Sequence, residues 1–156
     1  MGVYFCREDA FVAEHLLHDP ELAADAVQET LDIPVGIIVS AWGGSTIQTW
    51  LSQDVIENEF ADDFKLSGME AAVEDPKQNH QFPCLLYNGQ VAGLVPYTFK
   101  GMLWYQGEAN RSRPALYTRM QTAYAQMMRR TFNVPDAPFY FVQIAPFDYH
   151  QKDDFK

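Results

Sequence analysis

Residues 101–110, Gly-Met-Leu-Trp-Tyr-Gln-Gly-Glu-Ala-Asn, place polar groups directly after a short apolar run. The apolar run at 102–105 is typical of a buried strand, and Gln106, Gly107 and Glu108 follow it. In an open α/β sheet, ligands bind beyond the carboxyl ends of the strands, and a glycine allows the backbone to turn sharply there. We therefore expect the Gln106 carboxamide and the Glu108 carboxylate to stand at the mouth of a site. An ordinary strand-to-helix loop is the alternative interpretation, because polar strand ends are common.

A second strand end offers backbone donors for the same site. Residues 35–40 are rich in β-branched side chains and apolar on both faces, which is typical of a buried parallel strand, and Gly43 and Gly44 follow them. Because neighbouring parallel strands end at the same edge of a sheet, the two turns are expected to meet. The N–H groups of the glycine pair and the Gln106 carboxamide together predict an oxyanion hole, which stabilises the charge that develops on a carbonyl oxygen during acyl transfer. Phosphate binding is the competing use of such a turn, but neither the Walker spacing nor the dinucleotide fingerprint is present.

Alternating strands and helices are expected to position these turns. Leu116, Met120, Ala123 and Met127 recur at helical spacing after Pro114, which is a favourable first residue of a helix. The expected elements are a helical face within 3–17, a helix over 20–31, a strand over 35–40, a short helix within 48–60, a surface loop with one helical turn over 61–81, a strand over 100–105, the helix that begins at 114 and a strand over 139–145. This order predicts an α/β domain with a mostly parallel sheet that is covered on both faces.

Composition and charge restrict the class of protein. With 156 residues, of which 47% are hydrophobic, the chain is long enough for one domain with a sizeable core. A formal net charge of −10, spread along the chain, disfavours nucleic acid and anionic membranes as partners. No apolar run approaches the roughly 18 residues of a membrane span, and no signal peptide follows Met1, so the chain is either cytoplasmic or has lost its leader. Cys6 and Cys84 have no metal-binding or disulfide spacing and are expected to be small buried hydrophobes.

Three blocks of this sequence resemble the sialate O-acetylesterases, a family of SGNH-type serine hydrolases related to the acetylxylan esterases. The blocks are residues 34–50 (Pro-Val-Gly-Ile-Ile-Val-Ser-Ala-Trp-Gly-Gly-Ser-Thr-Ile-Gln-Thr-Trp), residues 86–89 (Leu-Tyr-Asn-Gly) with Pro96 and residues 100–110, and residues 139–146 (Phe-Tyr-Phe-Val-Gln-Ile-Ala-Pro). The match covers roughly residues 33–146 with gaps, and the order and spacing of its blocks make it specific. Residues 9–30 do not share it and are interpreted as an insertion.

The resemblance implies an SGNH-hydrolase fold, which is a flavodoxin-like three-layer α/β/α sandwich, present here as a single incomplete domain over residues 1–156. It also implies hydrolysis of O-acetyl esters on sugars, with sialic acid as the expected substrate. In that family a serine attacks the acetyl carbonyl, and a histidine held by an acidic residue removes the serine proton. Carried over by motif, Gly43 or Gly44 gives a backbone oxyanion donor, and Gln106 gives the side-chain donor. Glu108 would orient the site or support the histidine, and no metal or organic cofactor is implied.

Three residues near these turns are expected to bind the substrate, namely Trp42, Asn110 and Arg111. Trp42 stands beside the glycine pair and is expected to line the pocket and to stack against a sugar ring. Arg111, together with Arg113, could pair with a sialic acid carboxylate. Asn110 is the last residue of the block that holds the carboxamide and the carboxylate.

The nucleophile and the base of the family have no counterpart in this sequence. A Gly-Gln-Ser-Asn-like motif and an Asp-x-x-His motif are both absent, and Asp148 and His150 lie one residue too close together. Ser45 follows two glycines, but it lacks the Gly-x-Ser-x-Gly elbow of an exposed nucleophile. We therefore expect the chain to be the middle of a longer enzyme, completed by missing segments or a second copy, and to hydrolyse aryl acetates negligibly on its own.

Three functions remain open from the sequence. The leading one is a fragment of a sialate O-acetylesterase that acts on an acetylated sugar. A non-catalytic carbohydrate-binding relative would keep the cleft without a nucleophile, and an acetylxylan esterase would act on plant polysaccharide. The family favours a secreted, periplasmic or lysosomal location, although no signal peptide is visible in this sequence.

Overall fold

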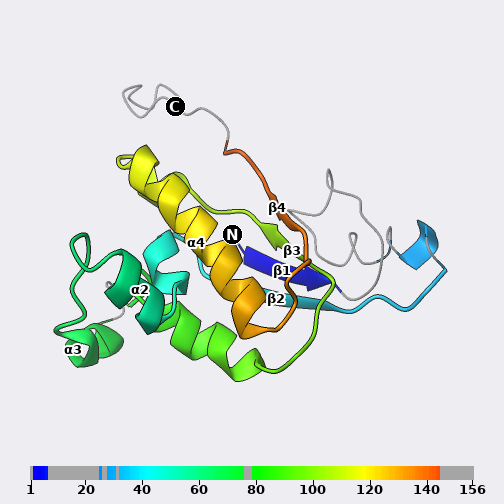
Figure 1. The fold of residues 1–156 in the computed structure, drawn as a ribbon, viewed down its shortest axis with the longest axis horizontal. Coiled ribbons are helices and arrows are strands. Elements are labelled where there is room, and N and C mark those ends of the chain that lie inside the picture. Colours follow the sequence, from blue (N-terminus) through cyan, green and yellow to red (C-terminus); the bar gives the residue numbers. More distant parts are fainter. Residues whose placement is uncertain (1, 7–24, 26–27, 31, 76–78, 145–156) are drawn as a thin grey trace, which may run out of the picture.

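Four short strands form the sheet of this computed structural model, which describes residues 2–6, 25, 28–30, 32–75 and 79–144 (Figure 1). The strands are β1 (Gly2–Cys6), β2 (Ile37–Ala41), β3 (Gly101–Trp104) and β4 (Phe139–Phe141), in the order β2-β1-β3-β4 across the sheet. β1 pairs antiparallel with both β2 and β3, whereas β3 pairs parallel with β4. Therefore β2, β3 and β4 run in one direction and β1 runs against them.

Strand β1 corrects two predictions made from the sequence. The helical face predicted within 3–17 is wrong at its start, because residues 2–6 form β1. Val3, Tyr4 and Phe5 are β-branched or aromatic and favour a strand, and pairing with both neighbours satisfies their backbone groups. The prediction of mostly parallel pairing is correct for β3 and β4 and wrong for the two pairs that β1 makes.

The three longer helices lie where the sequence predicts helical structure, whereas two short ones, over residues 87–94, fall in a segment for which it predicts no helix. The longer ones are α2 (Gln53–Glu59), α3 (Met69–Glu74) and α4 (Pro114–Thr131). The short ones are the 3-10 helices η1 (Ile47–Trp50), η3 (Ala92–Leu94) and η4 (Glu108–Asn110) and the π-helix η2 (Tyr87–Val91). Asp25 and residues 28–30 are helical, and the other residues of the helix predicted over 20–31 lie outside the described part of the chain. Of the helices that the structure describes, none has the length and apolar character needed to cross a membrane.

Helix α4 is the long element that covers the sheet (Figure 1). It has Pro114 in its first turn and Arg129 and Arg130 in its last turn. The positive charges of the two arginines interact favourably with the carboxyl end of the helix dipole. The apolar stripe predicted for this helix is confirmed, since all its members are buried: Leu116, Met120, Ala123 and Met127. The sequence pattern therefore identified both the helix and the face that it buries.

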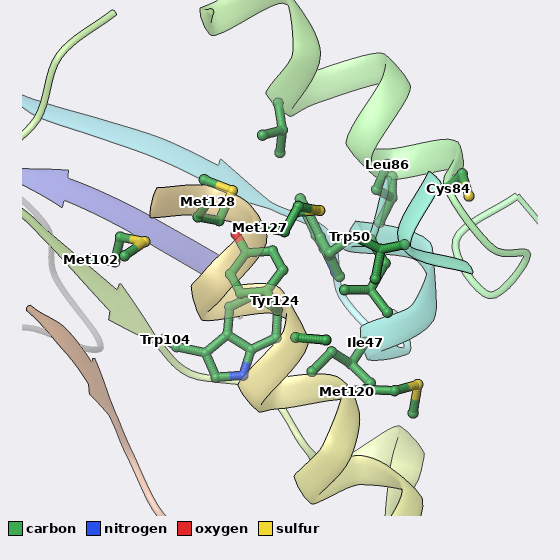
Figure 2. Close-up of a cluster of buried hydrophobic side chains, with 14 of the residues drawn as sticks. Ile47, Trp50, Cys84, Leu86, Met102, Trp104, Met120, Tyr124, Met127 and Met128 are labelled. Atoms are coloured by element: carbon green, nitrogen blue, oxygen red, sulfur yellow. The ribbon is translucent and has the colours of Figure 1, made fainter. Parts of the chain in front are cut away.

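The core lies between α4, η1 and one face of the sheet (Figure 2). Trp104 of β3 lies against Tyr124 of α4, with 4.4 Å between the ring centroids, and Trp50 of η1 meets Trp104 edge-on at 6.5 Å. A buried aromatic side chain removes about 150–250 Å² from water. These three rings therefore supply a large share of the apolar contact that holds helix and sheet together.

The register of the strands separates the two faces of the sheet. Ile38, Met102 and Phe139 lie in one row across the strands and contact the core. Val39 and Tyr140 lie in the next row, on the opposite face, and are 49% and 39% exposed. The prediction that β2 is buried on both faces is thus wrong for Val39, which lies on an edge strand of the described sheet. The α/β architecture is established, whereas the second helical layer of a three-layer sandwich stays a prediction.

Cys84 fixes the segment before η2 to helix η1. Its N–H donates to the Gln48 carbonyl at 3.1 Å, and its side chain is fully buried, which confirms the prediction of a small core residue. Burial raises the pKa of the Cys84 thiol to about 12, and the carboxylates of Glu57 and Asp54 add to the rise.

We expect the Cys84 thiol to resist alkylation at pH 8 in the folded protein, because the thiolate is the reactive form. The unfolded thiol ionises near its ordinary pKa of 9.0 and the native thiol near 12, so its contribution to stability is complete below pH 9 and is lost as the pH rises to 12. Iodoacetamide labelling of a Cys6→Ser variant, followed by mass spectrometry with and without denaturant, measures this thiol alone. Equal labelling of the folded and unfolded protein would contradict the expectation.

Candidate active site

Strands β2 and β3 deliver their carboxyl ends to the same edge of the sheet. Ser40 of β2 and Trp104 of β3 both lie opposite Val3 of β1. The turns that follow these two strands therefore leave the sheet side by side, one on each side of β1. The antiparallel pairing of β1 changes the neighbours of β2 and β3 but not their direction.

A hydrogen-bond network behind these turns joins them directly. Gln106 Nε2 donates to the Ser45 carbonyl at 2.9 Å and to Asn110 Oδ1 at 2.8 Å. Asn110 Oδ1 also accepts the Ile47 N–H at 2.9 Å, and Asn110 Nδ2 donates to Gln48 Oε1 at 3.2 Å. The prediction that the two turns meet is confirmed, and Asn110 is the residue that bridges them.

Backbone groups fix which way these carboxamides point. The Ser45 carbonyl can only accept and the Ile47 N–H can only donate, so Gln106 must present its nitrogen and Asn110 its oxygen to them. Both Gln106 N–H groups are thus used, its side chain is only 4% exposed, and its Oε1 has no partner among the described residues. Donation from Gln106 to a ligand stays a prediction, and it requires the release of one of these two bonds.

The glycine turn is the accessible part of this edge. Gly43 and Gly44 are exposed, and Trp42 beside them is 43% exposed. Gly44 has a φ of 73°, a left-handed conformation that favours glycine, and the Ser45 N–H closes the turn on the Trp42 carbonyl at 3.4 Å. Their backbone donors and an aromatic side chain therefore stand on the open side of the Gln106 network.

His80 lies against this turn, and no sequence signal marked it. A Cβ at Gly44 would lie 3.7 Å from His80 Nε2, and the Thr46 N–H donates to the His80 carbonyl at 3.3 Å. His80 Nδ1 is shielded from solvent and has no partner among the described residues. Among the described residues, His80 is therefore the histidine that lies at the glycine turn. His150 lies outside the described residues.

Glu108 places a carboxylate two residues after Gln106, at the start of η4. Its Oε2 is shielded from solvent and has no hydrogen-bond partner within the described part of the chain. The Tyr117 hydroxyl accepts from Trp104 Nε1 at 3.0 Å and donates to the Gln106 carbonyl at 2.5 Å, which fixes the backbone before Glu108. Burial raises the pKa of Tyr117, and the charge of Glu108 acts in the same direction.

The remaining predicted site residues differ in their surroundings. The Ser45 hydroxyl is buried and accepts from Trp50 Nε1 at 3.0 Å, which is a structural use of the side chain rather than that of an exposed nucleophile. Arg111 is exposed and donates to the Glu108 carbonyl at 3.2 Å, close to the turn. Arg113 already pairs with Asp63 at 2.7 Å. Among the described residues, no group of three or more acidic, histidine or cysteine side chains is arranged to hold a metal ion.

The two motif-bearing turns meet beyond the carboxyl ends of strands that run in one direction, which is where α/β proteins bind their ligands. A model of the family "Carbohydrate esterase, sialic acid-specific acetylesterase" matches residues 19–156, so this chain belongs to that family.

The relatives that match this chain are named sialate O-acetylesterases. The chain is 31% identical to the sialate O-acetylesterases of Homo sapiens and Pongo abelii over 109 residues, which is 67% of this chain and 19% of each relative. It is 29% identical to the sialate O-acetylesterase of Rattus norvegicus over 150 residues, 76% of this chain and 28% of the relative. The chain thus spans less than a third of these relatives. No solved structure matches the chain significantly.

Proposed function

We propose that this chain supplies the oxyanion-hole side of an SGNH-type esterase domain that hydrolyses O-acetyl esters on sialic acid. The observation that carries the proposal is the hydrogen bond from Gln106 Nε2 to the Ser45 carbonyl, because it holds two blocks of the family together at one sheet edge. Residues 1–156 would form part of a single three-layer α/β/α domain. Its second helical layer would cover the face on which Val39 and Tyr140 are exposed.

The catalytic contribution of the chain would be electrostatic. The N–H groups of Gly43 and Gly44 would donate to the acetyl oxygen as negative charge develops on it, and Gln106 would donate from its side chain or hold the turn in place. Glu108 would accept an N–H group of the catalytic histidine. The unpartnered Glu108 Oε2 supports this role, because a shielded acceptor without a donor is costly.

Substrate binding would involve side chains around the same turn. The half-exposed Trp42 would stack on a sugar ring, and Arg111 would approach the sialic acid carboxylate from the Glu108 side. Asn110 would act from behind the turn, through the bonds by which it bridges Gln106 and Ile47. The nucleophilic serine and the base would come from outside this chain.

The test is acetate release by the full-length protein that carries this chain. We expect release from O-acetylated N-acetylneuraminic acid, its loss after treatment with a covalent serine inhibitor, and no measurable release by residues 1–156 alone. Release from acetylated xylan in place of the sialic acid ester would assign the protein to the acetylxylan esterases. Serine-dependent turnover by residues 1–156 would contradict the proposal that the nucleophile lies elsewhere.

A non-catalytic carbohydrate-binding relative is the second candidate. Two observations favour it: the sequence has no Gly-Gln-Ser-Asn-like motif, and both Gln106 N–H groups are given to protein acceptors. Glycan binding by the full-length protein without any acetate release would establish this function instead.

A further inference from the structure

A cavity of about 180 Å³ lies behind the glycine turn, between η1, η4 and the first turns of α4. Its lining includes the polar residues Thr46, Gln48 and Asn110 and the apolar residues Phe64 and Leu116. Neither Trp42 nor the glycine pair borders it, so it is separate from the proposed oxyanion hole although it shares the Asn110 network. The proposed function leaves this cavity unused.

The lining combines polar and apolar side chains, and a sugar ring likewise has polar hydroxyl groups and apolar C–H groups. Hydroxyl and carboxamide groups suit ring hydroxyls, and an aromatic or aliphatic wall suits the C–H face of a ring. The volume is below the roughly 300–1,000 Å³ of pockets that hold drug-sized ligands. One ring therefore fits the cavity better than an oligosaccharide.

The two carboxamides at the cavity retain donors for a ligand. Gln48 Nε2 donates to the Gln81 carbonyl and Asn110 Nδ2 donates to Gln48 Oε1, each at 3.2 Å. A carboxamide nitrogen carries two N–H groups, so each side chain keeps a second N–H beyond these bonds within the described residues. Because these bonds hold the carboxamides in place, little side-chain freedom would be lost on binding.

Arg113 adds a fixed charge at the rim. It is held by Asp63 at 2.7 Å, and its guanidinium carbon lies 5.9 Å from the centroid of the Phe64 ring. A guanidinium has five N–H donors, so this ion pair leaves others available at the cavity mouth.

We propose that this cavity is a subsite for one sugar ring of the acetylated substrate, bound by the Gln48 and Asn110 carboxamides against Phe64 and Leu116. The inference rests on the proposed function, because the ring would belong to the glycan whose ester lies at the neighbouring glycine turn. The cavity would contribute to binding of the substrate and would take no part in the hydrolysis of the ester.

The experiment titrates the full-length protein that carries this chain with the methyl α-glycoside of N-acetylneuraminic acid and follows the backbone amides of residues 1–156 by NMR. We expect the largest shifts at Thr46, Gln48 and Asn110. Ser112→Trp places an indole at the exposed rim of the cavity and should weaken binding by about tenfold or more, in the range typical of a blocked pocket contact. Thr122→Trp is the matched control. Thr122 lies on α4 and is exposed, as Ser112 is, but it does not line the cavity.

Two further results decide between the inference and the function on which it rests. Ala109→Leu narrows the cavity from η4 and keeps the test available if Ser112→Trp fails to fold. Unchanged affinity in both variants, or shifts confined to other surfaces, would overturn the inference. The titration involves no ester, so it tests the cavity separately from the esterase activity. Acetate release by the full-length protein without sugar binding at the cavity would overturn the inference and leave the proposed function intact. Binding here without acetate release would support the inference and remove the esterase function.

Discussion

Replacing Asn110 with alanine is expected to lower the free energy of unfolding by about 3 kcal/mol, because it leaves two buried donors without an acceptor. The Ile47 N–H and Gln106 Nε2 both donate to Asn110 Oδ1, and both residues are buried. An unsatisfied buried donor typically costs about 1–3 kcal/mol. Two such donors would together cost about 2–6 kcal/mol, and water that enters the vacated space from the adjacent cavity brings the expected loss to about 3 kcal/mol.

Urea denaturation of the two proteins, followed by circular dichroism, measures the difference in the free energy of unfolding. Asn58→Ala is the matched control, because the Asn58 side chain is exposed on α2 and, among the described residues, donates only to the Asp54 carbonyl. We expect that control to stay within about 0.5 kcal/mol of the wild type. If Asn110→Ala were no less stable than Asn58→Ala, the bridge between the two turns would not hold this edge of the sheet together.

The meeting of the two turns was predictable although the sheet pairing was not. The rule used was that strands of one direction end at one edge, and β2 and β3 do run in one direction. An antiparallel strand inserted between them reverses the pairing twice and so leaves their relative direction unchanged. Helix α4 was predictable for a different reason, since its apolar residues keep one helical period from Leu116 to Met127.

What the sequence left open depends on contacts between distant segments. Strand β1 has only five residues, too few for periodicity to distinguish a strand from a buried helical turn. His80 comes to the glycine turn from a weakly periodic acidic segment, so no local pattern marked its contact with Gly44. The bridging role of Asn110 is visible only once its partners at positions 47 and 106 are placed in space.

Gln106 has two possible roles, of which the sequence suggested only the first, donation to a reacting carbonyl, and the structure adds the second, the bond to the Ser45 carbonyl. As a donor to a reacting carbonyl it would need a free N–H, but both of its N–H groups are held by Ser45 and Asn110. To act as a donor, Gln106 must give up a hydrogen bond to a protein oxygen and form one to the substrate oxygen. This exchange becomes favourable only in the transition state, when the substrate oxygen is more negative than a carbonyl oxygen. The same residue also fixes the Ser45 carbonyl, and thereby the turn that carries the proposed backbone donors.

If the proposed function is correct, replacing Gln106 with leucine in the full-length protein that carries this chain is expected to lower kcat by about 100- to 1,000-fold, the usual effect of removing one oxyanion-hole donor. The side chains have similar bulk, so the main change is the loss of the donor to Ser45 and Asn110. The KM for the O-acetyl ester should change little, because an interaction made in the transition state affects kcat rather than ground-state binding. Steady-state kinetics of acetate release measure both constants.

The amide NMR shifts of Gly43 and Gly44 in the variant separate the two ways in which Gln106 could act. Unchanged shifts with a large fall in kcat would indicate direct donation to the substrate, whereas altered shifts would indicate that Gln106 works by positioning the turn. Gln53→Leu is the matched control, because Gln53 is exposed on α2 and its side chain donates only to Glu57, at 2.7 Å, within the part of the chain that the structure describes. A folded Gln106→Leu protein with the same kcat as Gln53→Leu would exclude both roles, since the carboxamide would then contribute to neither the oxyanion nor the turn.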